Sequence, residues 1–374
     1  MSVIAVRHAL GRYDVHVEPG ILWSLPELLA NALGGRKLVL ITDDIVARCQ
    51  DEWSSGATAP RGSAPSAAAI RHRCEVRLTF PAGEEHKNRE TWAALSDDML
   101  RRGLDRQTGI VALGGGVVGD LAGFVAATFL RGIPYAQVPT TLLAMLDASV
   151  GGKVGVDTPE GKNLIGAFHP PAVVVADPLT LLSLPDRVFR AGLAEAVKHG
   201  LIADADYFEW IEANTRPILA RDVEALTYLV RRSVELKAGV VSEDERESGR
   251  RAILNAGHTV AHGLEHESGY RIPHGEAVAL GLIAECRIAE RLGFAPAGLA
   301  ERVLGVNRSL GLPTRSGSVR IAQALEAMLH DKKNRDGQIR LALPTGLGRM
   351  HEGAGRWTVP ITEELLASAV AGLA

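Results

Sequence analysis

The sequence predicts two domains, an α/β domain over residues 1–183 and an all-α domain over residues 184–374. In the first half, short apolar runs alternate with helical patterns, which is typical of βαβ units and a mostly parallel sheet. After Leu184 almost every segment shows helical periodicity instead. The length of 374 residues fits two domains of ordinary size. The boundary is therefore placed close to Ser183, Leu184 and Pro185.

The elements of the first half are predicted from short apolar or alternating runs. Residues 37–42 (KLVLIT) form an apolar run that ends in Asp43 and Asp44, as expected for a buried strand. Residues 109–113 (GIVAL) predict a central strand that leads directly into three glycines. The remaining predictions are strands over residues 1–17 and 75–80, an amphipathic helix over residues 91–102 and an exposed low-complexity loop over residues 54–69.

The second half is predicted to consist of helices, because apolar residues recur there with a period of about 3.6. A short strand-like piece follows near the C-terminus, over residues 338–343. The predicted helices cover residues 189–201, 205–213, 223–241, 252–267, 275–292 and 297–310.

Composition limits the classes of function. A hydrophobic content of 46% with 23% charged residues is ordinary for a globular enzyme. The net charge of -3 and the pI near 6.5 argue against nucleic-acid binding. The cysteines, Cys49, Cys74 and Cys286, are scattered and indicate a reducing compartment. No signal peptide and no apolar run of about 18 residues is evident, so we expect a cytoplasmic protein without membrane contact.

Gly114, Gly116 and Gly119 form a G-x-G-x-x-G pattern between a predicted strand and a predicted helix. Glycines at this place let the backbone approach a pyrophosphate, which the N–H groups of the helix N-terminus then bind. The pattern predicts a Rossmann-like dinucleotide site. The acidic residue usually found about 20 positions further on is not evident. Asp43 or Asp44, at the end of an earlier strand, is the alternative partner for a ribose.

A histidine-rich segment between Leu254 and Gly281 predicts a metal site. Two of its histidines stand four residues apart on a predicted helix and share a face. Upstream, Glu195 lies among small apolar residues, where a solvated acid would be out of place. Two histidines with one carboxylate form a catalytic zinc set that leaves one position open. Ordinary surface or core histidines of a helical hairpin are the alternative. The four histidines are His258, His262, His266 and His274.

The glycine-rich residues 147–168 contain Lys153, Lys162 and Asn163, which could hold a phosphate. A P-loop is excluded because Val154 follows the lysine where Ser or Thr is required. A surface loop with solvated lysines is the alternative.

Further cations occur near the histidine segment and near the C-terminus. They are Lys237, Arg251, Lys332 and Lys333. Such a concentration of positive charge beside a metal indicates a small anionic substrate that carries phosphate and carboxylate.

Taken together, seven motifs resemble the 3-dehydroquinate synthase family, in family order from about residue 110 to 348. They are GGGVVGDLAGFVAATFLRG, QVPTTLLAMLDASVGGKVGV, GKNLIGAF, LPDRVFRAGLAEAVKHGLI, LNAGHTVAHGLE, PHGEAVALG and DKKNRDGQIRLALPTGLG. Residues 1–109 match more loosely, through TDD at residues 42–44 and GEEHK at residues 83–87. The resemblance implies a nucleotide-binding α/β domain, a helical C-terminal domain and an active site between them. It also implies NAD, one zinc or cobalt ion, and a homodimer.

The resemblance also implies roles for individual residues. The metal ligands would be Glu195, His258 and His274. NAD would contact Asp43, Glu84, Lys87, Gly115, Gly116, Asp120, Thr140, Thr141 and Lys162. The substrate phosphate would meet Lys153, Asn163, Asn255, His262, a lysine of the DKK motif (Lys332) and, from the partner subunit, Arg131. Lys237 and Arg251 would bind the carboxylate, Asp147 and Lys198 would line the metal pocket, and His266 is left as a surface histidine. The chain departs from the family pattern at Ala148, His199 and Ala256.

The activity that the resemblance implies is the conversion of 3-deoxy-D-arabino-heptulosonate 7-phosphate to 3-dehydroquinate and phosphate, a step of the shikimate pathway. It would proceed by transient oxidation with NAD, elimination of phosphate, re-reduction and an intramolecular aldol closure. One alternative is another sugar-phosphate cyclase, such as an amino-dehydroquinate synthase. A second is a metal-dependent polyol or glycerol-phosphate dehydrogenase. Lys237, Arg251 and Asn255 favour a carboxylated substrate and therefore the 3-dehydroquinate synthase activity over both alternatives.

Overall fold

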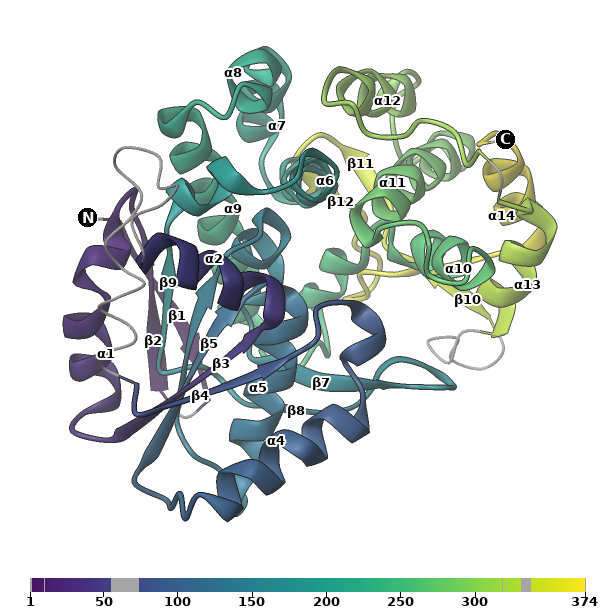
Figure 1. Cartoon of the computed structure of the whole chain (residues 1–374). Coiled ribbons are helices and arrows are strands. Elements are labelled where there is room, and N and C mark those ends of the chain that lie inside the picture. Colours follow the sequence, from purple (N-terminus) through teal and green to yellow (C-terminus); the bar gives the residue numbers. More distant parts are fainter. Residues whose placement is uncertain (1, 10, 55–73, 318, 331–337, 374) are drawn as a thin grey trace. The chain divides into compact units, whose positions relative to one another are not determined.

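The computed structural model describes residues 2–9, 11–54, 74–317, 319–330 and 338–373, and these form two compact units (Figure 1). The units are Met1–Leu184 and Pro185–Ala374, a division one residue beyond the boundary proposed from the sequence. Of the predicted loop over residues 54–69, only Ser54 is described, as the last residue of a helix. Lys332 and Lys333 lie outside the described residues.

The first unit contains a seven-stranded sheet with the strand order β1-β2-β9-β6-β5-β3-β4. Only the β1–β2 pair is antiparallel, so the prediction of a mostly parallel sheet is confirmed. Every residue of β5 is buried, as expected for a strand covered on both faces. The strands are β1 (Ser2–His8), β2 (Gly11–Val17), β3 (Lys37–Asp43), β4 (Val76–Phe80), β5 (Thr108–Gly114), β6 (Tyr135–Pro139) and β9 (Val173–Ala176).

Helices cover both faces of this sheet (Figure 1). On one face, α1 (Leu25–Leu33) packs through Leu25, Leu29 and Leu33, which recur every four residues. On the other face lie α4 (Arg89–Arg101) and the almost wholly apolar α5 (Gly116–Thr128). The other helical segments are α2 (Asp44–Ser54), η1 (Ile21–Ser24), η2 (Glu84–His86), η3 (Phe129–Arg131), η4 (Ala144–Ala148) and η5 (Pro178–Ser183).

The glycine-rich stretch after η4 forms a β-hairpin. Strand β7 (Lys153–Thr158) pairs antiparallel with β8 (Gly161–Phe168). A surface loop is the alternative that the sequence leaves open here, and no strand is predicted, because glycines interrupt the alternation that would indicate one. The hairpin places Lys153 at the start of β7, and Lys162 and Asn163 near the start of β8.

The second unit is mainly helical, as predicted, and the long helix α11 (His274–Arg291) packs against α6, α10, α12 and α14. The helix predicted over residues 252–267 is confirmed from His258 to Glu267, but the prediction is wrong for residues 252–257. A 3-10 turn, η6 (Arg250–Asn255), is separated from α10 (His258–Glu267) by Gly257, whose φ of 80° is left-handed and breaks the helix. The others are α6 (Asp186–Ala203), α7 (Ala205–Ala213), α8 (Thr215–Leu219), α9 (Val223–Glu243), α12 (Leu299–Ser309), α13 (Ile321–His330) and α14 (Glu363–Ala371).

Two small antiparallel pairs complete the second unit: β10 (Ile339–Leu341) with β13 (Val359–Ile361), and β11 (Pro344–Gly346) with β12 (Arg349–Met350). The predicted strand over residues 338–343 corresponds to β10. Among the described helices, none is both long enough and apolar enough to span a bilayer.

Candidate metal centre and nucleotide cradle

Two glycines of α11 bring three helices of the second unit into backbone contact. A Cβ atom on Gly275 would lie 1.7 Å from the carbonyl oxygen of Ala191 on α6. A Cβ atom on Gly281 would lie 2.0 Å from the carbonyl oxygen of Gly257, directly before α10. Real Cβ atoms do not approach oxygen so closely, so only glycine permits these crossings. They place the first turns of α10 and α11 beside the middle of α6.

Glu195, His258 and His274 meet where these helices cross. Glu195 is fully buried in α6, which confirms that this carboxylate is not a solvated acid. Its Oε1 atom lies 3.9 Å from Nε2 of His258 and 3.9 Å from Nε2 of His274. One ligand atom from each residue lies within 4.8 Å of the others, and the three form a group that could hold a metal ion.

Hydrogen bonds fix the tautomer of both imidazoles. Nδ1 of His258 lies 3.1 Å from the carbonyl oxygen of Ala256, and Nδ1 of His274 lies 3.2 Å from Oε2 of Glu265. A carbonyl and a carboxylate only accept hydrogen bonds, so each Nδ1 carries the proton and donates it. In its neutral form each imidazole then presents the Nε2 lone pair toward Glu195, as in metal sites where the second ring nitrogen is held by an oxygen.

The buried carboxylate of Glu195 is only partly compensated by the protein. Oε2 forms an ion pair with Lys198, one turn along α6. Within the described residues, no hydrogen bond reaches Oε1. A buried anionic oxygen without a donor is costly, and here two imidazole lone pairs face the same oxygen. This donor set fits a divalent cation of the zinc type.

The remaining histidines of the segment have different positions. His262 lies one turn after His258 on α10, with its ring 5.8 Å from that of His258 and 6.3 Å from that of His274. It is absent from the three-residue group described above. His266, a further turn along, is exposed, which confirms the prediction of a surface histidine.

Two buried cations and an amide lie on neighbouring elements of the same unit. Lys237 on α9 is 6% exposed and Arg251 in η6 is 3% exposed. The Arg251 guanidinium donates to the carbonyl oxygen of Glu245, and the Asn255 amide donates to Glu247. Both α9 and η6 pack against α6, the helix that carries Glu195. Buried cations are normally hydrogen-bonded or paired with an anion, and two on neighbouring elements could also bind an anionic ligand.

In the first unit, the glycine loop lies between the end of β5 and the start of α5. Gly115 is the N-cap of α5 and supplies no side-chain cap, so the N–H groups of the first turn stay available. A Cβ atom on Gly115 would lie 3.1 Å from Thr141, and one on Gly119 would lie 2.7 Å from Gln137. The loop is therefore a close-fitting cradle beside a helix N-terminus, suited to a phosphate.

Asp43 ends β3, the neighbour of β5 in the sheet. The chain continues from β3 to β4 on one side and from β5 to β6 on the other, so the strand order reverses between β3 and β5. Ligands of open α/β sheets bind at this point, beyond the carboxyl ends of the strands. Asp43 accepts a hydrogen bond from Val46, and burial raises the pKa of its carboxyl. Asp44 is engaged by the N–H of Ala82 and by Arg48.

Lys87 is the centre of a charged cluster next to this cradle. Its buried Nζ lies 2.6 Å from Oδ2 of Asp120 on α5 and 3.8 Å from Oε1 of Glu84. It also donates to Oδ1 of Asn163 on β8 at 2.6 Å. Desolvation lowers the pKa of Lys87, but Asp120 and Glu84 outweigh it, so the net shift is upward and the ammonium stays charged. Lys162 lies 3.7 Å from Oε1 of Glu84.

Comparison with known proteins identifies the relatives of this chain. The family model described as "3-dehydroquinate synthase N-terminal" matches residues 77–191. The family model described as "3-dehydroquinate synthase C-terminal" matches residues 192–334. A 3-dehydroquinate synthase of Nitrosomonas europaea is 43% identical over 360 residues, which cover 96% of this chain and 94% of the relative. The chain belongs to the 3-dehydroquinate synthase family.

Solved structures of sugar-phosphate cyclases share the fold. A 2-deoxy-scyllo-inosose synthase solved with carbaglucose-6-phosphate, NAD+ and Co2+ matches with a TM-score of 0.87 and 26% identity, over 99% of both chains. A 2-epi-5-epi-valiolone synthase of Streptomyces hygroscopicus subsp. jinggangensis 5008, with NAD+ and Zn2+ bound, matches with a TM-score of 0.83 and 29% identity, over 100% of this chain and 99% of that one.

The other described residues that the family resemblance singles out lie in the first unit. Thr140 and Thr141 follow β6, and the N–H of Thr140 donates to the carbonyl oxygen of Gly114 at 2.8 Å. Asp147 lies in η4. Arg131 ends η3 with a left-handed φ of 71°. Lys332 cannot be placed, because it lies outside the described residues.

Sequence reasoning did not find the carboxylates that hold the predicted site residues. Glu265, which accepts from His274, and Glu247, which accepts from Asn255, were not predicted. Glu265 stands seven residues after His258, on the same helix face, and is 1% exposed. That spacing is the signal that could have indicated a carboxylate beside the family's metal ligands.

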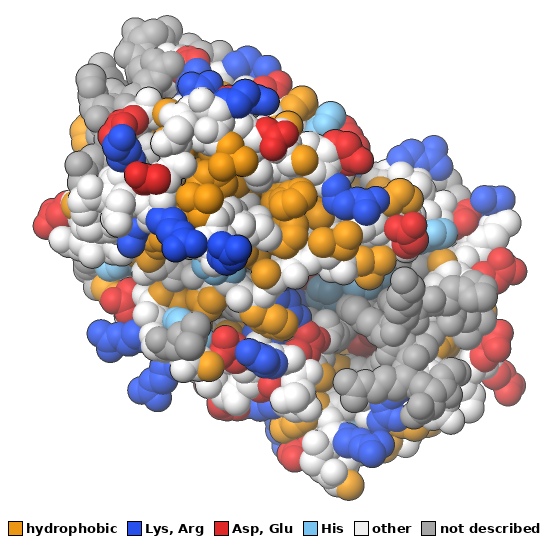
Figure 2. Space-filling model, turned by 90° about the horizontal axis from the view of Figure 1, so that it is seen from below, with side chains coloured by type: hydrophobic (Ala, Val, Ile, Leu, Met, Phe, Trp, Pro, Cys, Tyr) orange, Lys and Arg blue, Asp and Glu red, His pale blue; other side chains and the backbone are white. Residues whose placement is uncertain are grey.

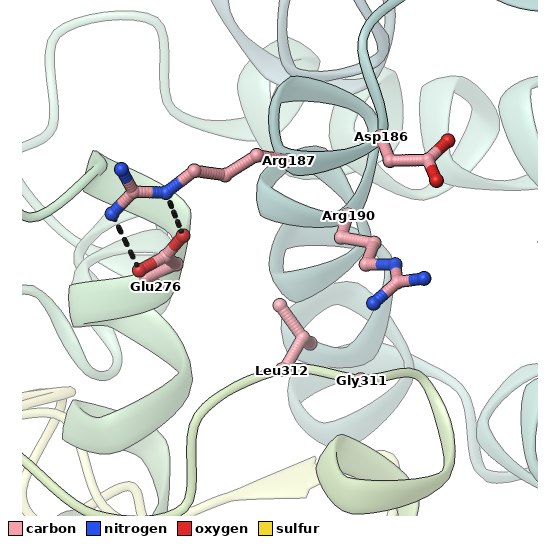
Figure 3. Close-up of a pocket in the computed structure, with 6 residues that line it drawn as sticks. All are labelled: Asp186, Arg187, Arg190, Glu276, Gly311 and Leu312. Atoms are coloured by element: carbon pink, nitrogen blue, oxygen red, sulfur yellow. Dashed lines mark hydrogen bonds and ion pairs between the residues drawn. The ribbon is translucent and has the colours of Figure 1, made fainter.

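A separate pocket of about 280 Å³ lies beside the N-terminal turn of α6 (Figure 3). Arg187 spans from α6 to Glu276 on α11 through bonds of 2.8 and 3.3 Å. This exposed pair joins the two helices one residue from Gly275. The lining residues are Asp186, Arg187, Arg190, Glu276, Gly311 and Leu312.

Proposed function

We propose that this chain is a 3-dehydroquinate synthase that converts 3-deoxy-D-arabino-heptulosonate 7-phosphate to 3-dehydroquinate and phosphate. The observation that carries the proposal is the convergence of two imidazole lone pairs and a buried carboxylate oxygen at Glu195, His258 and His274. The family membership selects this reaction among those that use such a centre.

Glu195, His258 and His274 would hold one zinc or cobalt ion, and the cradle at Gly115 and Gly116 would hold NAD. When bound, NAD accepts and later returns a hydride, while the metal polarises the substrate hydroxyl that is oxidised. The NAD-binding set would also include Asp43, Glu84, Lys87, Asp120, Thr140, Thr141 and Lys162. Two solved cyclases of this fold, with NAD+ and with Co2+ or Zn2+ bound, support both assignments.

The protein's own groups would bind the two anionic ends of the substrate. Lys237 and Arg251 would hold the carboxylate, since both are buried cations on elements packed against α6. The phosphate would meet Lys153, Asn163, Asn255, His262, Lys332 and a partner's Arg131. Donors fixed around the phosphate stabilise the negative charge that it gains on leaving. Asp147 and Lys198 would line the metal pocket, where Lys198 already neutralises one oxygen of Glu195.

The reaction is tested by phosphate release from the proposed substrate, with an added dehydroquinase to detect 3-dehydroquinate. The protein is first stripped with a chelator and then restored with zinc or cobalt in the presence of NAD. Activity that returns only with the metal, without net NADH, is the expected result. Accumulation of NADH would indicate a polyol or glycerol-phosphate dehydrogenase instead. Turnover of a sugar phosphate that lacks the carboxylate would indicate another cyclase.

The Asp43→Asn variant is expected to raise the KM for NAD about ten-fold, because a charge-assisted hydrogen bond to a ribose is worth roughly 1.5–3 kcal/mol. The amide oxygen can still accept from Val46, so the start of α2 is retained. Zinc content, measured by elemental analysis, should not change. The matched control is Asp44→Asn, whose carboxylate is occupied by Ala82 and Arg48. Equal effects of the two substitutions would contradict the ribose assignment.

The Arg251→Ala variant is expected to raise the KM for substrate about 100-fold while the KM for NAD stays unchanged. The loss of a buried charged hydrogen-bond donor to a carboxylate has this magnitude, about 3 kcal/mol. Steady-state kinetics with each substrate varied in turn measure both constants. Arg250→Ala removes the neighbouring exposed arginine, which pairs with Glu243, and serves as the control. Parallel losses of affinity for NAD and substrate would argue against a carboxylate clamp.

A homodimer completes the proposal, with Arg131 reaching the partner's phosphate site. The left-handed backbone at Leu130 and Arg131 holds this segment in a conformation that non-glycine residues rarely adopt. Strand β8 also exposes Leu164, Ile165 and Phe168, by 46%, 37% and 48%. Figure 2 shows a face on which apolar side chains gather among Lys and Arg side chains. Exposed apolar surface of this kind is typical of protein interfaces.

We place the enzyme in the cytoplasm.

A further inference from the structure

A second buried carboxylate, Glu285 on α11, contacts the backbone just before α10. Glu285 is 1% exposed, and its Oε2 atom accepts a hydrogen bond of 2.7 Å from the N–H of Gly257. In the described part of the chain, Oε1 has no hydrogen-bond partner. The proposed reaction does not use this group, and its burial calls for an explanation.

The N–H of Gly257 belongs to the same peptide group as the carbonyl of Ala256. That carbonyl accepts from Nδ1 of His258 at 3.1 Å. Because a peptide group is planar and stiff, Glu285 on one side and the imidazole of His258 on the other are joined through a single rigid unit. The order of contacts is Glu285 carboxyl, peptide 256–257, His258 imidazole and then Glu195.

Each imidazole of the proposed metal centre is thus supported by a buried carboxylate, directly for His274 and through a peptide group for His258. Glu265 accepts directly from Nδ1 of His274. For His258 the acceptor is a peptide carbonyl, and the opposite end of that peptide is held by Glu285. The backbone carbonyl of Gly257 is itself pressed against Gly281, where a Cβ atom would lie 2.0 Å away. Both sides of Gly257 are therefore fixed by α11.

We infer that Glu285 is a positioning residue for the metal centre, which acts on His258 through the peptide between Ala256 and Gly257. The inference rests on the proposed function, because it assumes that His258 binds a metal ion. Carboxylates that orient ligating histidines typically change metal affinity 10- to 100-fold. Glu285 would orient its histidine in the same way, but with one peptide group between the carboxylate and the imidazole.

The charge state of Glu285 indicates which substitution should keep the hydrogen bond from Gly257. Burial raises the pKa of Glu285 to about 8, an effect that the bond from Gly257 only partly offsets. At neutral pH the side chain is mainly a neutral acid whose carbonyl oxygen accepts from Gly257. Glutamine has the same shape and the same acceptor, so Glu285→Gln should preserve the contact. Alanine removes it and leaves a buried N–H without its acceptor.

The test compares the zinc dissociation constants of Glu285→Ala and Glu285→Gln, measured by competition with a chromogenic chelator. We expect about a ten-fold weaker constant for alanine and a nearly unchanged constant for glutamine. Cys286→Ala is the matched control, since Cys286 is equally buried on the same helix but makes no bond to Gly257. If the alanine variant binds zinc like the unmodified protein, or if glutamine fails to restore binding, the inference is wrong.

A double-mutant cycle separates this inference from the proposed function. In a His258→Ala background, Glu285→Ala should weaken zinc binding no further, because its effect passes through His258. An additive effect would contradict the positioning role. If His258→Ala itself leaves zinc affinity unchanged, the metal centre is wrong and the inference falls with it. As an independent readout, deuterium exchange in the metal-free protein should be faster over residues 256–260 in the alanine variant and normal in the glutamine variant.

Discussion

The His274→Ala variant is expected to lose zinc and turnover together, each by more than 100-fold. In the proposed site His274 would supply one of three protein ligand atoms, and its Nε2 lies 3.9 Å from Oε1 of Glu195. Removing a ligand should cost more than the 10- to 100-fold loss typical of residues that only orient one. Zinc content after dialysis against a weak chelator, together with phosphate release, measures both effects.

Two controls from the same histidine segment sharpen this prediction. His266→Ala removes an exposed histidine and should change neither zinc content nor turnover. His262→Ala should keep its zinc but lose activity, because we place His262 at the phosphate. Full zinc occupancy in the His274→Ala variant would refute the ligand assignment. Loss of zinc in the His262→Ala variant would mean that the ligand set was divided wrongly.

The fold classes of both halves could be predicted because they depend on local patterns. Apolar runs such as residues 37–42 and 109–113 become β3 and β5, and period-3.6 segments become α6, α9 and α11. The break at Gly257 could not be read in the same way. A glycine within a helical pattern is tolerated at many positions. At this one, contacts from Glu285 and Gly281, both remote in sequence, hold it in a left-handed conformation.

For the proposed metal centre, too, some residues could be predicted from their sequence neighbours, whereas others depend on contacts remote in sequence. Glu195 and the histidines could be singled out because their residue types are unusual in their surroundings. The same criterion, a carboxylate within an apolar run, also applies to Glu285 in residues 277–286 (AVALGLIAEC). Glu265 is followed by the polar residues 266–268, so no apolar run marks it as buried. Only its spacing of seven residues from His258 indicates it. Which carboxylate supports which imidazole depends on helix crossings, and the sequence pattern does not specify these.

The Gly275→Ala variant is expected to have the largest effect on stability. The added Cβ atom would lie 1.7 Å from the carbonyl oxygen of Ala191 and 2.5 Å from its carbonyl carbon. Both are backbone atoms of a packed helix, so no side-chain rotation relieves the clash and α11 must move away from α6. Overpacking in a core costs about 1–3 kcal/mol where side chains can adjust. Here we expect ~4 kcal/mol or more, in the range that a single substitution rarely reaches.

In thermal unfolding, such a loss should lower the Tm by about 10 °C or more, given a shift of roughly 2–4 °C per kcal/mol for units of this size. Gly239→Ala is the matched control, because this glycine lies in α9 with no atom near the position of the new Cβ. That substitution should be neutral or stabilising by up to about 1 kcal/mol, as expected for alanine within a helix. His274 precedes Gly275 directly, so a displaced α11 also carries its imidazole away from Glu195. Gly275→Ala protein that remains folded should therefore bind zinc more weakly than the Gly239→Ala control. A nearly unchanged Tm with normal zinc binding would show that α6 and α11 do not meet at Gly275.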